Sequence, residues 1–461
     1  QSSPLKVDET AEPFHVQQAK QIRAYQAGEL LIQERIQNES DLEQIVVKIS
    51  INGKLVWVDL FSSSFEQLLR VTIQNSYGSI YGESVFRDAI KALHAQAMLG
   101  GIERKKIYKI CALENEDIYY NTNDDDGSIY EIAKDGIKKL SDDDPQPIFL
   151  KQQNMKANVN RKIIFDNPFA IRNFSRLCRI QKQDRIVFEV HVICEFLKNI
   201  PIPIIIVHGE QGSAKTSISN GVKYVVDPEV ENSLSMPTDT EDLVVAMSKR
   251  EVSSFDNIDT FEKIVSDLLC RVVTGTMQSK RKLYTNSDSY DIYLKEKIIL
   301  NGITPSVDQP DLVQRSIFYE LLKIDEKDRL TDEIFLKRLD GLRPYVVGNA
   351  LQAIRKAMLI IDDVKEEIDK KLPRMADFAV WGEAISRVLG NADYVFLNAY
   401  KERLTNSNLN LSEEYPIISP LMSLLNDTSE AFKKTVADLY DLIAPEDQWG
   451  KRKTNMPNSA S

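Results

Sequence analysis

The chain has 461 residues, 43% of them hydrophobic and 28% charged, and a formal net charge of −11. This composition is that of an ordinary globular protein, and the length favours about three domains. The negative charge argues against a protein that coats nucleic acid non-specifically, and without a signal peptide or an apolar run of roughly 20 residues we expect a cytoplasmic protein with no membrane partner.

The first 150 residues predict a helix followed by a small α/β module without visible chemistry. Apolar spacing predicts one helix over 16–38, and we assign residues 1–45 to an N-terminal helix and linker. Alternating apolar residues on both sides of Asn52-Gly53 predict a tight hairpin at the start of a module that spans 46–150. Its other expected elements are one helix and three strands, at 84–97, 106–112, 117–121 and 128–132.

The remainder divides into four parts by the spacing of its apolar residues. These parts are a helical connector at 151–200, an α/β core at 201–325, a helical domain at 326–444 and a polar, loose tail at 445–461. Pro457-Asn458-Ser459 looks like a helix cap with no helix behind it.

The most informative stretch runs from Gly209 to Thr216 and reads Gly-Glu-Gln-Gly-Ser-Ala-Lys-Thr after an apolar, β-branched run. Glycines between a strand and a helix let backbone N–H groups approach phosphates, while a lysine neutralises the terminal phosphates and a hydroxyl binds Mg²⁺. We favour this interpretation over a chance turn. It predicts an ATP and Mg²⁺ site whose nucleotide-binding residues are Gly209, Glu210, Gln211, Gly212, Ser213, Ala214, Lys215, Thr216 and Ser217.

Within this stretch, Lys215 is the expected catalytic cation and Thr216 the expected metal ligand. The phosphate-loop pattern has a glycine where this chain has Ala214. Because alanine is a good helix former, we expect Ala214 to lie in the first turn of the helix that follows.

A candidate metal ligand, Asp256, follows Lys215 by forty-one residues, at the end of a short predicted strand. An acid at a strand end can hold Mg²⁺ directly or through water, so we assign Asp256 to catalysis and to the metal. Asn257 stands where many hydrolytic relatives carry a second carboxylate; it cannot accept a proton but can orient a water. The general base is left unassigned, the other candidates being Glu210, Glu251 and Asp259.

Two further catalytic candidates follow a predicted hairpin over 281–294, whose turn is expected at 286–289. Asn301 ends the next apolar strand, where an amide can sense the γ-phosphate and hold the attacking water. Arg315 follows 14 residues later, and arginine is suited to bidentate phosphate contact and to neutralising transition-state charge. Their order after the phosphate loop favours catalytic roles over ordinary surface turns.

This series of motifs resembles the AAA+ ATPases of the superfamily-three helicase type. More closely, the chain resembles a family of phage, prophage and plasmid ATP-binding proteins that are often encoded beside or fused to primases. The resemblance runs from about residue 40 to the C-terminus and includes Ala214 and Asn257 as they stand here. It is carried by residues 208–216, 255–257, 283–285, 299–302, 310–315 and 372–378.

The resemblance implies an α/β fold with an AAA+ P-loop core between a small N-terminal module and a C-terminal helical domain. The family usually continues into a small module that resembles a winged helix, so we expect the tail at 445–461 to be the start of that module, truncated here. The resemblance also implies a ring, usually hexameric, in which Arg315 reaches the ATP of the neighbouring subunit as an arginine finger. Arg374 is expected either near the nucleotide or paired with Asp377. The hairpin would grip DNA in the central channel through basic and aromatic residues at its foot, namely Lys280, Arg281, Lys282 and Tyr284.

The sequence therefore predicts an ATP-driven helicase or translocase, or a DNA-dependent ATPase, in replication of a virus, plasmid or other mobile element. Its expected partners are single-stranded or forked DNA, further copies of itself and a primase. The basic run is as readily explained as a solvated face, since Asp288 near the turn repels DNA. The alternatives are an ATP-gated assembly module without translocation and, less favoured, a phosphotransferase that uses the same loop.

Overall fold

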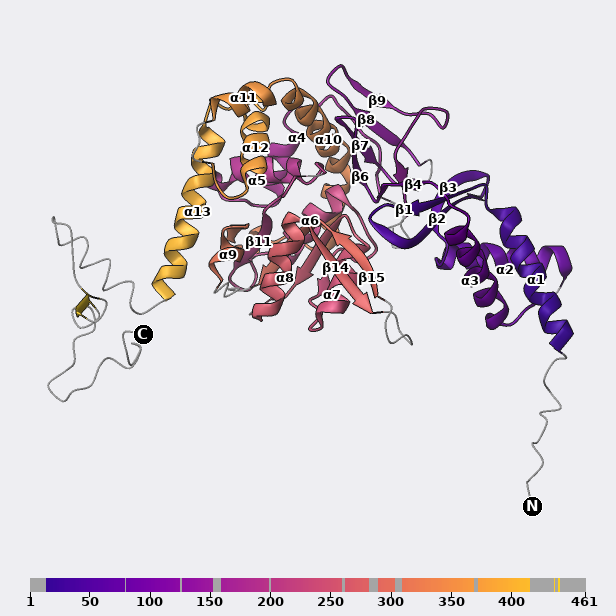
Figure 1. Ribbon diagram of the computed structural model, residues 1–461. Helices are drawn as coiled ribbons and strands as arrows, with labels where there is room; N and C mark the ends of the chain where they lie inside the picture. Colours follow the sequence, from indigo (N-terminus) through magenta and orange to yellow (C-terminus); the bar gives the residue numbers. More distant parts are fainter. Residues whose placement is uncertain are drawn as a thin grey trace.

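The computed structural model describes residues 14–78, 80–124, 127–151, 159–198, 200–258, 262–281, 289–302, 309–368 and 372–414, with 435 and 438–439. Helices and strands alternate around a central parallel sheet, so the fold is of the mixed α/β kind (Figure 1). Among the described helices, none combines the length and the apolar content that crossing a bilayer requires.

The N-terminal part packs three helices and a four-stranded sheet around a separate apolar core. In order, the elements are α1 (Phe14–Leu31), β1 (Glu34–Asn38), β2 (Asp41–Ile51), β3 (Lys54–Asp59), α2 (Ser63–Tyr77), α3 (Glu83–Leu99) and β4 (Arg104–Lys105). The sheet order is β3-β2-β1-β4, and α1 packs on α3. The prediction of one helix over 16–38 is wrong at its end, because residues 34–38 pair with the long strand β2.

The hairpin between β2 and β3 is confirmed. Asn52 and Gly53 have φ angles of 52° and 79°, which are the left-handed values that a two-residue turn with the twist of its strands requires. The paired residues run from Val46 opposite Asp59 to Ile51 opposite Lys54.

Two further sheets connect this part to the core. One is the parallel pair of β5 (Ile107–Tyr108) and β10 (Ile148–Phe149), and the other is an antiparallel sheet of β6 (Cys111–Glu114), β7 (Asp117–Asn121), β8 (Ile129–Ile132) and β9 (Ile137–Lys139) in that order. The strand expected over 106–112 is therefore split in two. Between the two halves, Lys109 reaches away to donate to Glu296 Oε1 at 2.8 Å and to the carbonyl of Arg250 at 2.7 Å.

The central sheet has five strands that all run in the same direction, in the order β12-β13-β16-β11-β17. They are β11 (Ile204–Gly209), β12 (Leu234–Ser235), β13 (Val252–Asp256), β16 (Lys297–Gly302) and β17 (Ser316–Leu321). The connecting helices are α6 (Lys215–Val226), α7 (Thr240–Ser248), α8 (Lys263–Thr274) and α9 (Pro310–Val313). Because a parallel sheet is covered on both faces, its strands are nearly continuous apolar runs, and their carboxyl ends share one edge.

A layer of helices completes the molecule, and it joins segments far apart in the sequence. Its elements are α4 (Ala170–Leu177), η1 (Lys182–Asp184), α5 (Arg185–Cys194), η2 (Glu326–Asp328), α10 (Asp332–Met358), α11 (Ile361–Glu367), α12 (Ala376–Val388) and α13 (Val395–Glu414). Helix α10 packs on α4, α6 and α12, and α5 packs on α12. The buried guanidinium of Arg343 connects α10 to β7, because it donates to Tyr120 Oη at 3.0 Å.

A buried group of charges lies under the amino ends of the central strands. Glu251 accepts hydrogen bonds from Lys297 Nζ at 2.9 Å and Lys198 Nζ at 3.1 Å. Burial alone would raise the pKa of Glu251, but the two ammonium groups outweigh it and hold that pKa below its usual value. Glu195 lies nearby, but no lysine donates a hydrogen bond to its carboxyl group within the described residues. Neither of its carboxyl oxygens has a hydrogen bond within the described residues, and burial raises its pKa to about 8.

Glu195 therefore makes stability depend on pH in a defined direction. Its pKa rises from 4.5 to about 8 on folding, so the folded state favours the protonated form and this group's contribution is lost as pH rises between those values. We expect Glu195→Gln, which removes the charge and keeps the shape, to stabilise the protein at pH 8 by about 1–3 kcal/mol. In urea denaturation of both proteins the difference should close toward pH 4; an equal stability at pH 8 contradicts the assignment.

Candidate active site

The phosphate-loop motif forms a tight bend between β11 and α6 at the carboxyl edge of the sheet. Gly209 and Gly212 have φ angles of 145° and 84°, a region that glycine adopts without strain. A Cβ atom on Gly209 would lie 2.3 Å from the carbonyl oxygen of Leu321, so only glycine fits there. Ser213 Oγ donates to the carbonyl of Glu210 at 2.9 Å and closes the bend.

Ala214 does not lie in the first turn of the helix, so that prediction is wrong. It is the N-cap of α6, with φ 62° and ψ 32°, and the helix begins at Lys215. The bend requires a left-handed residue at this point, which is why the general pattern has glycine there. In this chain an alanine accepts the strain.

Replacing Ala214 by glycine should relieve that strain. A left-handed conformation costs an L-residue about 1–2 kcal/mol, and the greater entropy of glycine in the unfolded chain offsets part of the gain. We expect Ala214→Gly to raise the free energy of unfolding by about 0.5–1 kcal/mol. The matched control is Ala92→Gly, at an exposed position inside α3, which should lower it by about 1 kcal/mol. Equal losses in both variants would contradict the strain argument.

The loop lysine and the two expected metal ligands lie together at this edge. Lys215 Nζ donates to the carbonyl oxygens of Gly209 and Glu210 at 2.8 and 2.9 Å. Burial lowers its pKa, while the carboxylate of Asp256 acts in the opposite direction. Thr216 Oγ1 donates to Asp256 Oδ1 at 3.3 Å. A hydroxyl beside a carboxylate is a donor set that suits Mg²⁺, which keeps waters and phosphate oxygens as its other ligands.

The described residues contain no group of three or more His, Cys, Asp or Glu side chains that could hold a metal ion. A Mg²⁺ ion that arrives with a nucleotide needs no such group, so the pair formed by Thr216 and Asp256 fits it.

Asn301 lies between the phosphate loop and Asp256, because β16 is the strand between β11 and β13. Its side chain is 1% exposed, and its Oδ1 accepts from the backbone N–H of Asn257 at 3.2 Å. Its Nδ2 is buried with no hydrogen-bond partner among the described residues. A buried donor left unpaired costs roughly 1–3 kcal/mol, and a phosphate oxygen or a water held at this edge would satisfy it.

The structure narrows the choice of general base. Glu251 lies beneath the opposite edge of the sheet, bound to Lys297 and Lys198, so it is excluded. Asp259 lies outside the described residues. Glu210 is exposed in the phosphate loop, and Asn257, in a left-handed conformation with φ 57°, follows Asp256.

Arg315 lies at the amino edge of the sheet, opposite the phosphate loop. Its carbonyl accepts from the N–H of Ile204, the first residue of β11. Gly209 is the last residue of this six-residue strand, five steps and about 17 Å further along. Its guanidinium is 13% exposed and pairs with Asp311 of the same turn. Arg315 therefore cannot reach the phosphate loop of its own chain.

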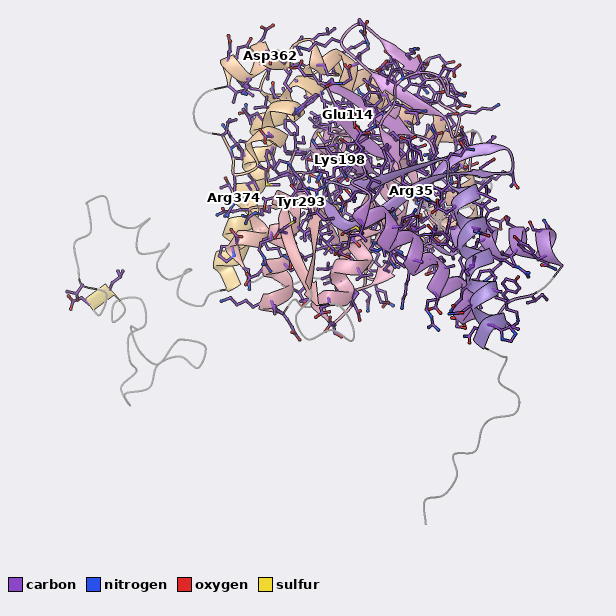
Figure 2. The ribbon with its side chains drawn as sticks, turned by 45° about the vertical axis from the view of Figure 1, so that its right-hand side comes forward. Arg35, Glu114, Lys198, Tyr293, Asp362 and Arg374 are labelled. Carbon is purple, nitrogen blue, oxygen red and sulfur yellow. The ribbon has the colours of Figure 1, made fainter. Side chains whose placement is uncertain are left out.

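Arg374, labelled in Figure 2, lies in the segment before α12. It pairs with Asp311 and donates to Gln314 Oε1 at 3.2 Å. Within its own chain, Arg374 lies beside Asp311 and Arg315 at the amino edge, away from the phosphate loop, and its observed ion pair is with Asp311 rather than with Asp377.

The arginine that does lie at the loop is Arg329, which the sequence analysis missed. A Cβ atom on Gly212 would be 3.0 Å from Arg329 Nη2. Arg329 follows η2, and α10 begins three residues later, where Asp332 accepts from Ser217 Oγ at 3.0 Å. The sequence offers one indication of this role, namely that Arg329 follows soon after the last strand of the core.

The expected hairpin is present, with different bounds. Strand β14 (Thr276–Arg281) pairs with β15 (Ser289–Leu294), ending with Arg281 opposite Ser289. Lys280 and Arg281 therefore lie at the last pairs of the described ladder, opposite Tyr290 and Ser289. The prediction that they lie at the foot is wrong, because the strand begins at Thr276, five residues earlier than expected. Lys282 and Tyr284 fall outside the described residues. Strand β15 also packs on β2 and α7.

Comparison with known proteins gives one family match. The sequence profile of the family described as actinomycete integrative conjugative element replication protein matches residues 171–409, a little over half of the chain. No curated protein sequence matches. The similar solved structures include the apo C-terminal region of NrS-1 (13% identity, 83% of this chain and 89% of that chain, TM-score 0.39). They also include "SCCmec type IV Cch - active helicase" (14% identity, 86% and 76%, TM-score 0.42).

Proposed function

The chain belongs to the family of actinomycete integrative conjugative element replication proteins, and from this premise we propose that it is an ATP-hydrolysing DNA helicase or translocase. The observation that carries the proposal is the gathering of Lys215, Thr216, Asp256 and Asn301 at the carboxyl edge of one parallel sheet. Ligands of open parallel sheets bind at that edge. We assign the core to the AAA+ class of the superfamily-three helicase type.

In this proposal the backbone of the bend holds the α- and β-phosphates, and Lys215 with Arg329 neutralises the terminal ones. Thr216 and Asp256 hold Mg²⁺, which supplies charge neutralisation when the nucleotide is bound. Asn301 uses its free Nδ2 to fix the γ-phosphate or the attacking water. Asn257 orients that water, and its backbone N–H is already fixed by Asp256 Oδ1 at 2.7 Å.

The position of Arg315 favours an oligomer. At the amino edge it can only assist hydrolysis in a neighbouring subunit, as a ring with one ATP per interface requires. We therefore propose a homo-oligomeric ring, hexameric as in the proteins that the chain resembles. Its substrate would be single-stranded or forked DNA, gripped in part by Lys280 and Arg281 on the hairpin. A primase remains a partner proposed from the resemblance alone.

The test measures ATP turnover with and without single-stranded DNA, and strand displacement from a forked duplex. Turnover that single-stranded DNA stimulates, with displacement of the strand, supports the motor. The second candidate is an ATP-gated assembly module, favoured by Asn257 in place of a second carboxylate. Oligomer formation that depends on ATP, with a turnover rate indifferent to DNA and no displacement, would replace the motor by that module.

A further inference from the structure

A cavity of about 760 Å³ lies between the N-terminal part and the core, away from the phosphate loop. On the core side it is lined by Lys249, shortly before β13, and by Glu296, immediately before β16. Both strands begin there and end at Asp256 and Gly302 respectively, so the cavity lies at the opposite edge of the sheet from the candidate nucleotide site. Strand β15 of the hairpin forms part of its wall.

The cavity is positive in a protein whose net charge is −11. Its lining contains six lysines and three carboxylates: Lys106, Lys109, Lys151, Lys198, Lys249 and Lys295, with Asp41, Asp59 and Glu296. Positive charge gathered in a concave site attracts polyanions far more strongly than the same charges spread over a surface.

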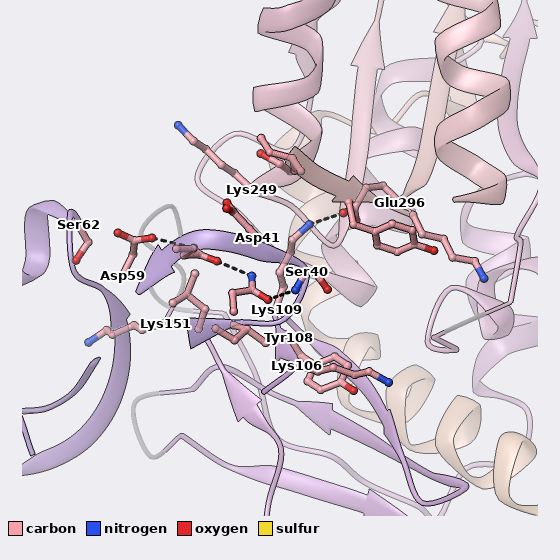
Figure 3. Close-up of a pocket in the computed structure, with 18 of the residues that line it drawn as sticks. Ser40, Asp41, Asp59, Ser62, Lys106, Tyr108, Lys109, Lys151, Lys249 and Glu296 are labelled. Atoms are coloured by element: carbon pink, nitrogen blue, oxygen red, sulfur yellow. Dashed lines mark hydrogen bonds and ion pairs between the residues drawn. The ribbon is translucent and has the colours of Figure 1, made fainter. Parts of the chain in front are cut away.

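Five of these lysines divide into two groups. Lys109 and Lys198 are bound to Glu296 and Glu251, and the first of these ion pairs joins the two parts of the chain. Lys106, Lys151 and Lys249 are exposed, and their ammonium groups make no ion pair or hydrogen bond within the described part of the chain. Figure 3 shows them on different sides of the cavity. Their charges are free to meet a ligand.

Two aromatic side chains of the lining are also exposed. Phe61, after β3, is 55% exposed, and Tyr293, on β15, is 45% exposed. They belong to different walls, one from the N-terminal part and one from the hairpin. Free ammonium groups interleaved with exposed aromatic rings are the combination that binds unpaired nucleotides, through phosphates and base stacking respectively. Duplex DNA cannot use the rings in this way because its bases are already stacked on one another.

We propose that this cavity binds a short stretch of single-stranded DNA, with phosphates on Lys106, Lys151 and Lys249 and bases on Phe61 and Tyr293. The site is separate from the hairpin residues Lys280 and Arg281. This proposal rests on the proposed function only in its assumption that the ligand is DNA, and its tests are carried out without ATP. A failure of ATP hydrolysis therefore leaves these tests unaffected.

The first test compares a Lys106→Ala/Lys151→Ala/Lys249→Ala variant with the intact chain by fluorescence anisotropy, using labelled oligo-dT over a range of salt concentrations. We expect affinity at low salt to fall roughly 10- to 100-fold and the slope of log K against log salt to flatten by about 2. The matched control is Lys91→Ala/Lys139→Ala/Lys356→Ala, which removes the same charge from exposed positions away from the cavity. Equal losses in the two triple variants, or no loss in the first, overturn the proposal.

The second test separates stacking from charge. Phe61→Ala and Tyr293→Ala should each weaken binding about tenfold while leaving the salt slope unchanged, because neither removes a phosphate contact. Thermal unfolding of each variant shows whether the fold is intact. Unaltered affinity in folded aromatic variants, or competition by a free nucleotide as effective as that by oligo-dT, would assign the cavity to another ligand and overturn the proposal.

Discussion

Lys215→Ala should reduce ATP hydrolysis by roughly 100- to 1,000-fold or more. Lys215 belongs to the bend itself, and its ammonium already lies at hydrogen-bonding distance from the loop carbonyls. When a nucleotide binds, the Lys215 ammonium would exchange the loop carbonyls for the terminal phosphates, where negative charge builds up in the transition state. Steady-state phosphate release at saturating ATP and Mg²⁺ measures the loss.

Two controls show whether the loss of turnover is specific to the phosphate loop. Lys356→Ala removes the same charge at an exposed position near the far end of α10, about 36 Å along the helix from the loop, and should leave turnover within a few-fold of the wild type. Calorimetry with Mg²⁺ and ATP should show weaker binding for Lys215→Ala and unchanged unfolding temperature. Full turnover by a folded Lys215→Ala protein would remove the nucleotide site from this loop and with it the proposed function.

Arg315→Ala should cost about 1,000-fold in turnover, the effect of losing an arginine that neutralises the transferred phosphoryl group. Binding of ATP should be nearly unchanged, because the side chain lies at the edge of the sheet remote from its own loop. The decisive measurement is a mixture of Arg315→Ala with Lys215→Ala. In mixed rings about a quarter of the interfaces combine an intact loop with an intact arginine from the neighbour, so two inactive proteins should regain activity.

The pairing of Arg315 with Asp311 requires its own control, since the loss could arise from a disturbed turn. Asp311→Asn removes the charge that pairs with Arg315 but leaves the Arg315 guanidinium in the protein. This variant should preserve most of the turnover. If mixing restores no activity while native mass measurement shows mixed oligomers, Arg315 does not act across an interface. A monomer under every nucleotide condition would lead to the same conclusion.

Much of the core was predictable because its signals are local. Short strand-like runs before Gly209, Asp256 and Asn301 predicted strands, and parallel strands must bring their ends to one edge. The tight turn at Asn52-Gly53 was likewise predicted from the residues that occupy it. The chemical roles assigned to these residues remain predictions, as does the division of the chain into domains.

The features that could not be predicted depend on partners far away in the sequence. Residues 34–38 have helical spacing, yet they form β1 because β2 offers them a sheet edge. Ala214 is a good helix former by propensity, yet the geometry of the bend sets its conformation. Arg329 and Arg374 are indistinguishable by type, and only the folded chain places the first at Gly212 and the second at Asp311.

The short connection between the hairpin and the central sheet has a mechanical consequence. Only Lys295 and Glu296 separate the end of β15 from the start of β16, and β16 carries Asn301 at its far end. The same β15 rests on β2 of the N-terminal part. In the proposed motor, a displacement of Asn301 after loss of the γ-phosphate would therefore reach the hairpin and the N-terminal sheet by a short path through β16 and β15.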